Sequence, residues 1–83
     1  MKNWCVYIIL CSDDSLYTGI STDVQRRFSQ HKNKKGARYF YARQPLKIVF
    51  TELGHDRSSA SRREYEIKSY NRTQKIALIE ERT

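Results

Sequence analysis

The sequence predicts an α+β domain in which a three-stranded antiparallel sheet is flanked by helices, with the elements in the order ββαβαα. Three observations lead to this fold class. Residues 4–10 are apolar or aromatic at every position, which is typical of a central strand covered on both faces. Two helical patterns are separated by a further apolar run. The chain has 83 residues, 39% of them hydrophobic, which suits one small core and a single domain over residues 1–83.

The first two strands are expected to form a hairpin. Residues 12–15, Ser-Asp-Asp-Ser, are a turn cluster, and residues 16–20 make the second strand. Gly19 interrupts this strand, which indicates either a β-bulge or a close approach of the backbone to a ligand. Cys5 and Cys11 are about 20 Å apart in an extended strand, too far for a disulfide. We therefore expect buried free thiols in a reducing compartment.

The other elements follow from capping and turn residues. Thr22 is the expected N-cap of the first helix, with Gln25 at the capping-box position. The remaining boundaries are a helix end at residues 32–36, an irregular segment at 37–44, a strand at 46–53 after Pro45, a turn at 54–56, a helix at 57–70, a break at 71–73 and a short helix at 74–81.

The charge balance predicts a nucleic acid as the partner, and a soluble basic protein with dispersed charge is the alternative. The chain carries 16 Lys and Arg against 9 Asp and Glu, a net charge of +7, and such an excess on a small surface favours nucleic acid binding. The densest cluster is the basic-aromatic segment, which comprises Lys32, Lys34, Lys35, Arg38, Tyr39 and Arg43. Residues 4–10 are too few to span a bilayer. We expect a cytoplasmic protein with no membrane partner and no organic cofactor.

The first predicted helix carries polar residues on its apolar side. At about 100° per residue, His31 falls in the middle of the stripe that Val24 and Phe28 define. Arg27 lies at the border of this stripe, and Arg26 lies on the opposite side, facing solvent. A core histidine that is hydrogen-bonded to the backbone is the alternative interpretation of His31.

The second predicted helix turns one carboxylate inward. Glu64 shares an arc with Ala60 and Ile67, so it projects toward the protein body. An unpaired carboxylate there would be costly, and Glu64 therefore needs a cation: Arg27, a lysine or a metal ion. A structural Glu–Arg pair is the alternative. Two helices that each turn a titratable group inward favour a shared site.

These residues resemble the GIY-YIG endonuclease family, and in particular its small stand-alone bacterial UPF0213 group. Residues 5–7, Cys-Val-Tyr, stand where the family has Gly-Ile-Tyr, and residues 17–19, Tyr-Thr-Gly, stand where it has Tyr-Ile-Gly. Arg27, His31 and Glu64 fall at matching offsets for the family's helix arginine, its His or Tyr, and its metal-binding glutamate. The match spans nearly the whole chain.

The resemblance implies one divalent ion, Mg²⁺ or Mn²⁺, held by Glu64 and water molecules beside the scissile phosphate. Tyr17 would deprotonate the attacking water or relay its proton, and Tyr7 would orient that network. Arg27 would neutralise the charge that grows on the phosphate. His31 would share the proton transfer or bind phosphate. A phenol has a pKa of about 10, so Tyr17 needs nearby positive charge to act as a base.

The sequence departs from the family at two places. Ile20 stands where some members carry a lysine, which removes one cation near Tyr17. Asn71 is the nearest counterpart of an asparagine found beyond the glutamate in many members, at a shorter spacing. We take Gly19 and Asn71 as residues that would support the site from outside it.

Hairpin geometry provides a test of the shared site. Tyr7 and Tyr17 face the same side only if paired residue numbers sum to an even number, whereas a two-residue turn at Asp13 and Asp14 gives an odd sum. We therefore predict an odd-length loop or a bulge.

The leading functional hypothesis is a metal-dependent DNA endonuclease that hydrolyses phosphodiester bonds. We expect such an enzyme to recognise branched, nicked or flapped DNA by its shape and to act in repair or recombination. The alternative is a nucleic-acid-binding module with the same fold and little or no cleavage activity. A protein–protein adaptor with incidental charge ranks last.

Overall fold

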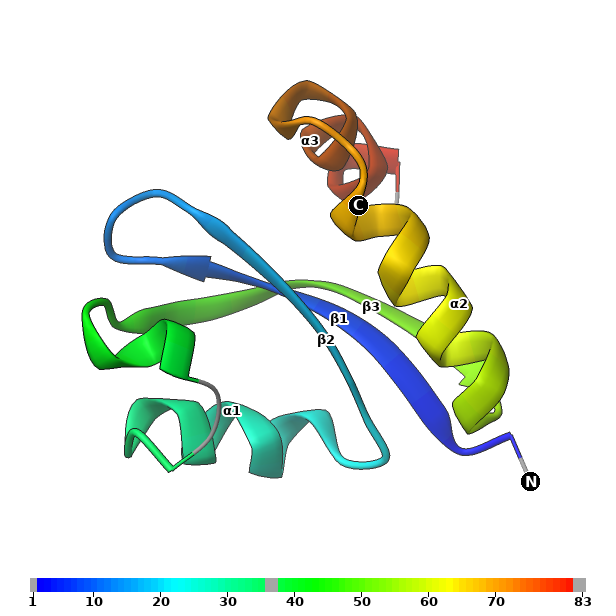
Figure 1. Ribbon diagram of the computed structural model, residues 1–83, viewed down its shortest axis with the longest axis horizontal. Helices are drawn as coiled ribbons and strands as arrows, with labels where there is room; N and C mark the ends of the chain where they lie inside the picture. Colours follow the sequence, from blue (N-terminus) through cyan, green and yellow to red (C-terminus); the bar gives the residue numbers. More distant parts are fainter. Residues whose placement is uncertain (1, 36–37, 82–83) are drawn as a thin grey trace.

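The computed structural model describes residues 2–35 and 38–81, and it confirms the α+β fold class and the order ββαβαα (Figure 1). The elements are strands β1 (Trp4–Cys11) and β2 (Leu16–Ser21), helix α1 (Val24–Lys32), the 3₁₀ helix η1 (Arg38–Tyr41), strand β3 (Pro45–His55), and helices α2 (Arg57–Lys68) and α3 (Arg72–Glu81).

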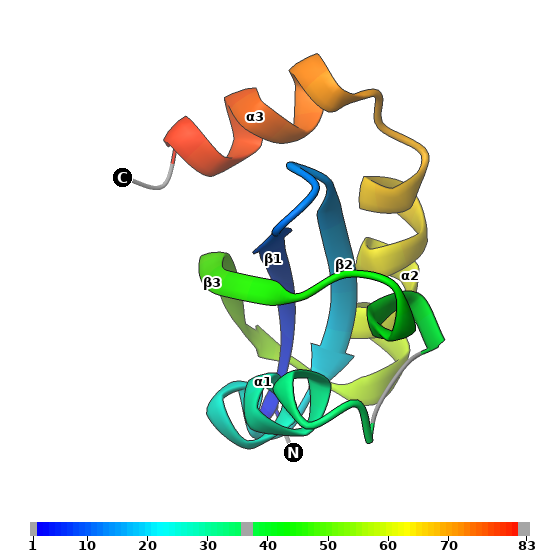
Figure 2. The ribbon, with the colours of Figure 1, turned by 90° about the vertical axis from the view of Figure 1, so that its left-hand side faces the viewer.

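The sheet is antiparallel with the order β2-β1-β3, so the apolar run forms the central strand as predicted. Helices α1 and α2 cover opposite faces of the sheet (Figures 1 and 2). Val6 and Ile8 are packed with Ala60 and Ile67 of α2. The alternate residues of β1, namely Tyr7, Ile9 and Cys11, are buried with Phe40 of η1 and pack against Val24 and Phe28 of α1. The site described below lies on the α1 side.

The hairpin has the odd-length loop that we predicted. Leu10 pairs with Leu16, and residues 12–14 form the loop between Cys11 and Ser15. Asp14 has a φ of 69°, as expected for a three-residue hairpin loop that ends in a left-handed residue. The paired residue numbers therefore have an even sum, and Tyr7 and Tyr17 lie on one face.

Several element boundaries differ from the prediction. The N-cap of α1 is Asp23, not Thr22, because the Asp23 carboxylate accepts the backbone N–H of Arg26 at 3.0 Å and aspartate caps helices better than threonine. Helix α2 ends at Lys68 rather than at residue 70, and α3 begins at Arg72 rather than at residue 74. The segment predicted to be irregular contains η1. The predicted helix stop at Gly36 and the start of the segment at Ala37 lie outside the described residues.

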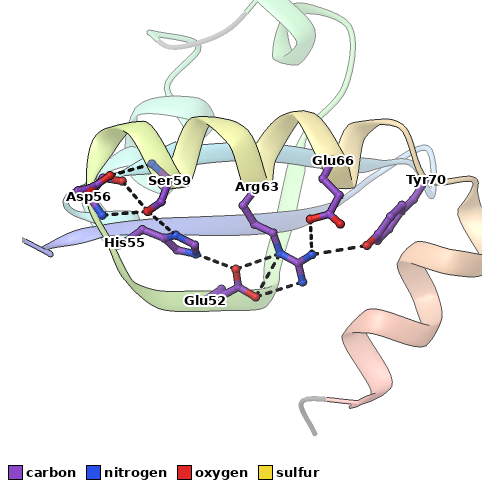
Figure 3. A network of polar contacts seen from close by, with 7 residues as sticks. All are labelled: Glu52, His55, Asp56, Ser59, Arg63, Glu66 and Tyr70. Atoms are coloured by element: carbon purple, nitrogen blue, oxygen red, sulfur yellow. Dashed lines mark hydrogen bonds and ion pairs between the residues drawn. The ribbon is translucent and has the colours of Figure 1, made fainter.

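A polar network fixes α2 against β3 (Figure 3). The Glu52 carboxylate accepts hydrogen bonds from His55 Nε2 at 2.7 Å and from Arg63 Nε at 3.0 Å, and Arg63 Nη1 donates to Glu66 at 2.7 Å. Burial tends to raise the pKa of Glu52, but the hydrogen bonds from His55 and Arg63 lower it overall. The network therefore holds one side of α2 against β3.

The two cysteines are free thiols, as predicted, but only Cys11 is buried and Cys5 is half-buried. Desolvation raises the pKa of both. Within residues 2–35 and 38–81, no helix has the length and apolar character needed to cross a membrane.

Candidate active site

Two phenols and an imidazole meet on the α1 face of the sheet. The Tyr7 hydroxyl lies 3.0 Å from Nε2 of His31, and both side chains are buried. The Tyr17 ring lies with its centroid 6.3 Å from that of Tyr7 and 5.3 Å from that of His31. Strand β1 supplies Tyr7, β2 supplies Tyr17 and α1 supplies His31. The structure thus brings together three residues that were predicted to share a site.

Gly19 makes this packing possible, but not for the reason that we predicted. It pairs with Tyr7 in an uninterrupted β1–β2 register, so there is no bulge at this position. A Cβ atom added to Gly19 would lie 2.5 Å from the Tyr7 hydroxyl oxygen and 2.7 Å from Cζ. Real side-chain atoms do not approach so closely. The glycine therefore leaves space for the Tyr7 ring and does not mark a bulge.

His31 is held in its neutral form. Burial, reinforced by the positive charge of Arg27, lowers the pKa of His31 from 6.5 to about 4. Among the described residues, its Nδ1 atom has no hydrogen-bond partner. A neutral imidazole with no exposed surface is poorly placed to bind a phosphate, so that half of the prediction does not fit this arrangement. Sharing a proton with the Tyr7 hydroxyl is compatible with it.

Arg27 is half-buried at the edge of this group. Its Nη1 atom donates to Oε1 of Gln30 at 3.0 Å, which orients the guanidinium. Burial raises the pKa values of Tyr7 and Tyr17, and the Arg27 charge lowers both but does not reverse the shift. By itself, Arg27 does not supply the positive charge that Tyr17 would need to act as a base.

Glu64 lies close enough to influence the same phenols. Its negative charge contributes to the raised pKa values of Tyr7 and Tyr17. Its side chain is 24% exposed, and its Oε2 atom lies 3.3 Å from Nζ of Lys68. The predicted inward direction and the need for a cation both fit, and the cation is a lysine one helical turn away.

The residues present fit a divalent ion held by one carboxylate. In the part of the chain that the structure describes, no group of three or more His, Cys, Asp or Glu could enclose a metal. Mg²⁺ often binds through one or two carboxylates, water molecules and substrate phosphates. Glu64 can supply one such oxygen ligand. The ion would then depend on the substrate for part of its coordination.

Several side chains of the basic-aromatic segment make contacts within the protein. The Tyr39 hydroxyl donates to Ser15 Oγ at 2.7 Å, and the guanidinium of Arg43 binds Asp13 and lies 4.0 Å from the Tyr39 ring centroid. Lys34 Nζ donates to the Phe40 carbonyl at 3.0 Å. Lys35 and Arg38 are exposed, and Lys32 lies 5.7 Å from the Phe28 ring centroid. DNA binding by this segment stays a prediction.

Asn71 has a local role. Its Oδ1 atom accepts the backbone N–H of Gln74 at 2.9 Å, and Gln74 Oε1 accepts the backbone N–H of Asn71 at 2.9 Å. This reciprocal pair is a cap for the start of α3. The asparagine that we considered as a supporting site residue is thus used as a helix N-cap.

Sequence reasoning missed several neighbours of the site. Gln30 and Lys68 lie three and four residues after Arg27 and Glu64, and this spacing places side chains in contact on a helix. That spacing could have identified both. Trp4 and Arg26 line a hollow beside Arg27, and no sequence pattern brings them together, because they come from β1 and α1.

Comparisons with known proteins define the class. The model of the GIY-YIG catalytic domain matches residues 3–77. The chain therefore belongs to the GIY-YIG family, which is a family of nucleases.

Within that family the chain is similar to UPF0213 proteins. A UPF0213 protein of Staphylococcus haemolyticus is 49% identical over 99% of this chain and the whole of the relative, and one from Staphylococcus aureus is 46% identical over the same shares. The solution structure of a UPF0213 protein from Bacillus halodurans matches with a TM-score of 0.59 and 42% identity, over 93% of this chain and 82% of that one.

Proposed function

We propose that this protein is a metal-dependent DNA endonuclease that hydrolyses phosphodiester bonds and selects branched, nicked or flapped DNA by shape, in repair or recombination. The observation that carries the proposal is the convergence of chemical groups at β2. Tyr7, Tyr17 and His31 are in contact, and the charges of Arg27 and Glu64 both act on the two phenols. Membership of a nuclease family supports the reaction class.

Each residue has one role in the proposed reaction. Tyr17 is the base that takes a proton from water. Tyr7, which is hydrogen-bonded to the buried His31, packs beside the Tyr17 ring and helps to orient it. Arg27, oriented by Gln30, stabilises the charge that develops on the phosphate. Glu64 is the carboxylate ligand. When bound, a divalent cation supplies positive charge that offsets the effect of Glu64 on the phenols and polarises the phosphate.

Two observations favour the alternative, a binding module without cleavage. Lys68 occupies the cation position at Glu64, and burial raises the pKa of Tyr17 in the metal-free protein. Both proposals predict DNA binding, so only cleavage separates them. The proposed enzyme requires that a divalent ion competes with an exposed ion pair, which contributes little at a protein surface.

The deciding experiment compares two acids on the same helix. Glu64→Gln should reduce nicking of branched DNA in Mg²⁺ or Mn²⁺ by at least about a hundredfold, the scale expected when a group that stabilises transition-state charge is lost. Its fold and DNA affinity should be retained. Glu66→Gln, which removes an exposed partner of Arg63, should cut like the wild type. If no branched, nicked or flapped substrate is cut by the wild type with either metal, the binding module is the correct function.

The pH dependence of cleavage tests the role of Tyr17. Since only the deprotonated phenol acts as a base, the single-turnover rate should rise about tenfold per pH unit below the Tyr17 pKa. Tyr17→Phe should lower the rate at least about a hundredfold and abolish this rise. Tyr65→Phe, at an exposed position on α2, should leave the profile unchanged. A Tyr17→Phe variant with the wild-type slope would assign the base to another group.

A further inference from the structure

A hollow of about 310 Å³ lies where β2 ends and α1 begins. Trp4 and Ile20 line it from the sheet, and Arg26, Arg27 and Gln30 line it from the helix. The volume is at the small end of ligand pockets, which is suitable for one nucleotide unit and too small for a duplex. We propose that this hollow holds one unpaired nucleotide next to the phosphate that the active site attacks, with its base stacked on Trp4. This inference rests on the proposed function.

Arg27 connects the hollow to the candidate active site. It lines the hollow, and its charge acts on the Tyr7 and Tyr17 phenols. A phosphate that contacts Arg27 therefore lies at the boundary of the two, and the nucleotide attached to it extends into the hollow. The position of this nucleotide relative to the cut is thus fixed by a shared residue.

The charges of the hollow suit a phosphodiester backbone. Its charged residues are Arg26, Arg27 and Asp23. The Asp23 carboxylate already accepts the backbone N–H of Arg26 as the cap of α1. The carboxylate keeps its charge, and the two guanidinium groups outnumber it, so the hollow is positive overall. Helical periodicity indicated that Arg26 is an ordinary solvent-facing charge. In the structure it is exposed and lines the hollow, where it can contact a phosphate that flanks the bound nucleotide.

Trp4 provides the surface for a base. It is the single tryptophan of the chain and is half-buried. The Arg57 guanidinium lies 5.6 Å from its ring centroid, which helps to hold the indole in place. Stacking on an aromatic ring requires a base whose face is uncovered, and it is tolerant of base identity. The hollow would therefore select an unpaired nucleotide, as found at a flap or branch, without reading sequence.

Fluorescence of the single tryptophan tests the proposal without any cleavage. The full chain is titrated in EDTA with a short single-stranded oligonucleotide, with a strand of equal length in which every base is replaced by an abasic position, and with a duplex of equal length. We expect the unmodified single strand to quench Trp4 emission, and the abasic strand and the duplex to quench it little. Equal quenching by all three would overturn the proposal.

Variants measured by the anisotropy of a labelled oligonucleotide separate stacking from charge. Trp4→Leu should weaken binding of the single strand at least about fivefold, whereas Tyr65→Leu, at an exposed aromatic residue of α2, should not. Because Trp4 also packs on the core, Arg26→Gln is the second variant. This variant should reduce the slope of log affinity against log salt concentration by about one, as expected for one lost phosphate contact. Wild-type behaviour of folded Trp4→Leu and Arg26→Gln would contradict the proposal.

Failure of the two proposals can be distinguished. Base-dependent quenching without cleavage on any substrate would retain the nucleotide site and reject the endonuclease. Cleavage of branched DNA with equal quenching by the unmodified strand, the abasic strand and the duplex would retain the endonuclease and reject the nucleotide site.

Discussion

Replacing Gly19 by alanine should destabilise the protein by about 3 kcal/mol or more and abolish cleavage. The new Cβ would lie 2.5 Å from the Tyr7 hydroxyl oxygen and 2.7 Å from its Cζ atom. Overpacking of this kind costs about 1–3 kcal/mol. If the ring moves away, the buried hydrogen bond between Tyr7 and His31 is broken, which costs a further 1–3 kcal/mol, approximately. At about 4–8 °C per kcal/mol, Tm should fall by more than about 12 °C, measured by thermal unfolding.

Gly54 is the matched control. It has a φ of +82°, and a Cβ added there has no neighbour within 4 Å. Gly54→Ala should therefore cost only the backbone strain of about 1–2 kcal/mol. Combining Gly19→Ala with Tyr7→Leu, whose shorter side chain clears the position, should cost less than the sum of the single changes by at least about 1 kcal/mol. Strict additivity would show that the two residues are not packed as described.

Acidification from pH 7 to pH 4 should destabilise the protein through His31. Its pKa is lowered from 6.5 to about 4 in the folded state by burial and by Arg27, so the unfolded chain binds the proton more readily. The stability contributed by the neutral form is complete above pH 6.5 and is lost as the pH falls toward 4. A shift of this size corresponds to about 3 kcal/mol. Urea unfolding at a series of pH values measures it.

The His31→Gln variant isolates this contribution. It keeps a hydrogen-bond acceptor for Tyr7 but does not titrate, so its stability should fall by about 3 kcal/mol less than that of the wild type over the same range. Ser15 and Arg43 lower the pKa of Asp13 to about 2. Protonation of such hydrogen-bonded carboxylates destabilises both proteins equally, and it occurs at still lower pH. An NMR titration of the imidazole, identified by its absence from the variant, that gave a pKa near 6.5 would contradict the prediction.

Local patterns predicted what local interactions determine. The apolar run gave the central strand, helical periodicity placed His31 and Glu64 on inward faces, and residue parity gave the hairpin loop. The errors arose where distant segments meet. Gly19 is explained only by Tyr7, twelve positions earlier in the chain and across the sheet.

The hollow beside Arg27 is a second example. It depends on the meeting of β1, the end of β2 and α1, and no periodicity within one helix reports such a meeting. Arg26 therefore looked like ordinary surface charge. The basic-aromatic segment likewise could not reveal that Arg43 binds Asp13 and that Tyr39 binds Ser15, because each pair joins distant parts of the chain.

The three-residue loop of the β1–β2 hairpin limits how this protein can evolve or be redesigned. After a one-residue deletion, Tyr17 stays opposite Ile9 only if a two-residue turn replaces the present loop. If three residues remain in the loop instead, the β1–β2 register slips by one residue and Thr18 takes the place of Tyr17 on the Tyr7 face. A change of loop length must therefore be accompanied by a turn sequence that suits the new length.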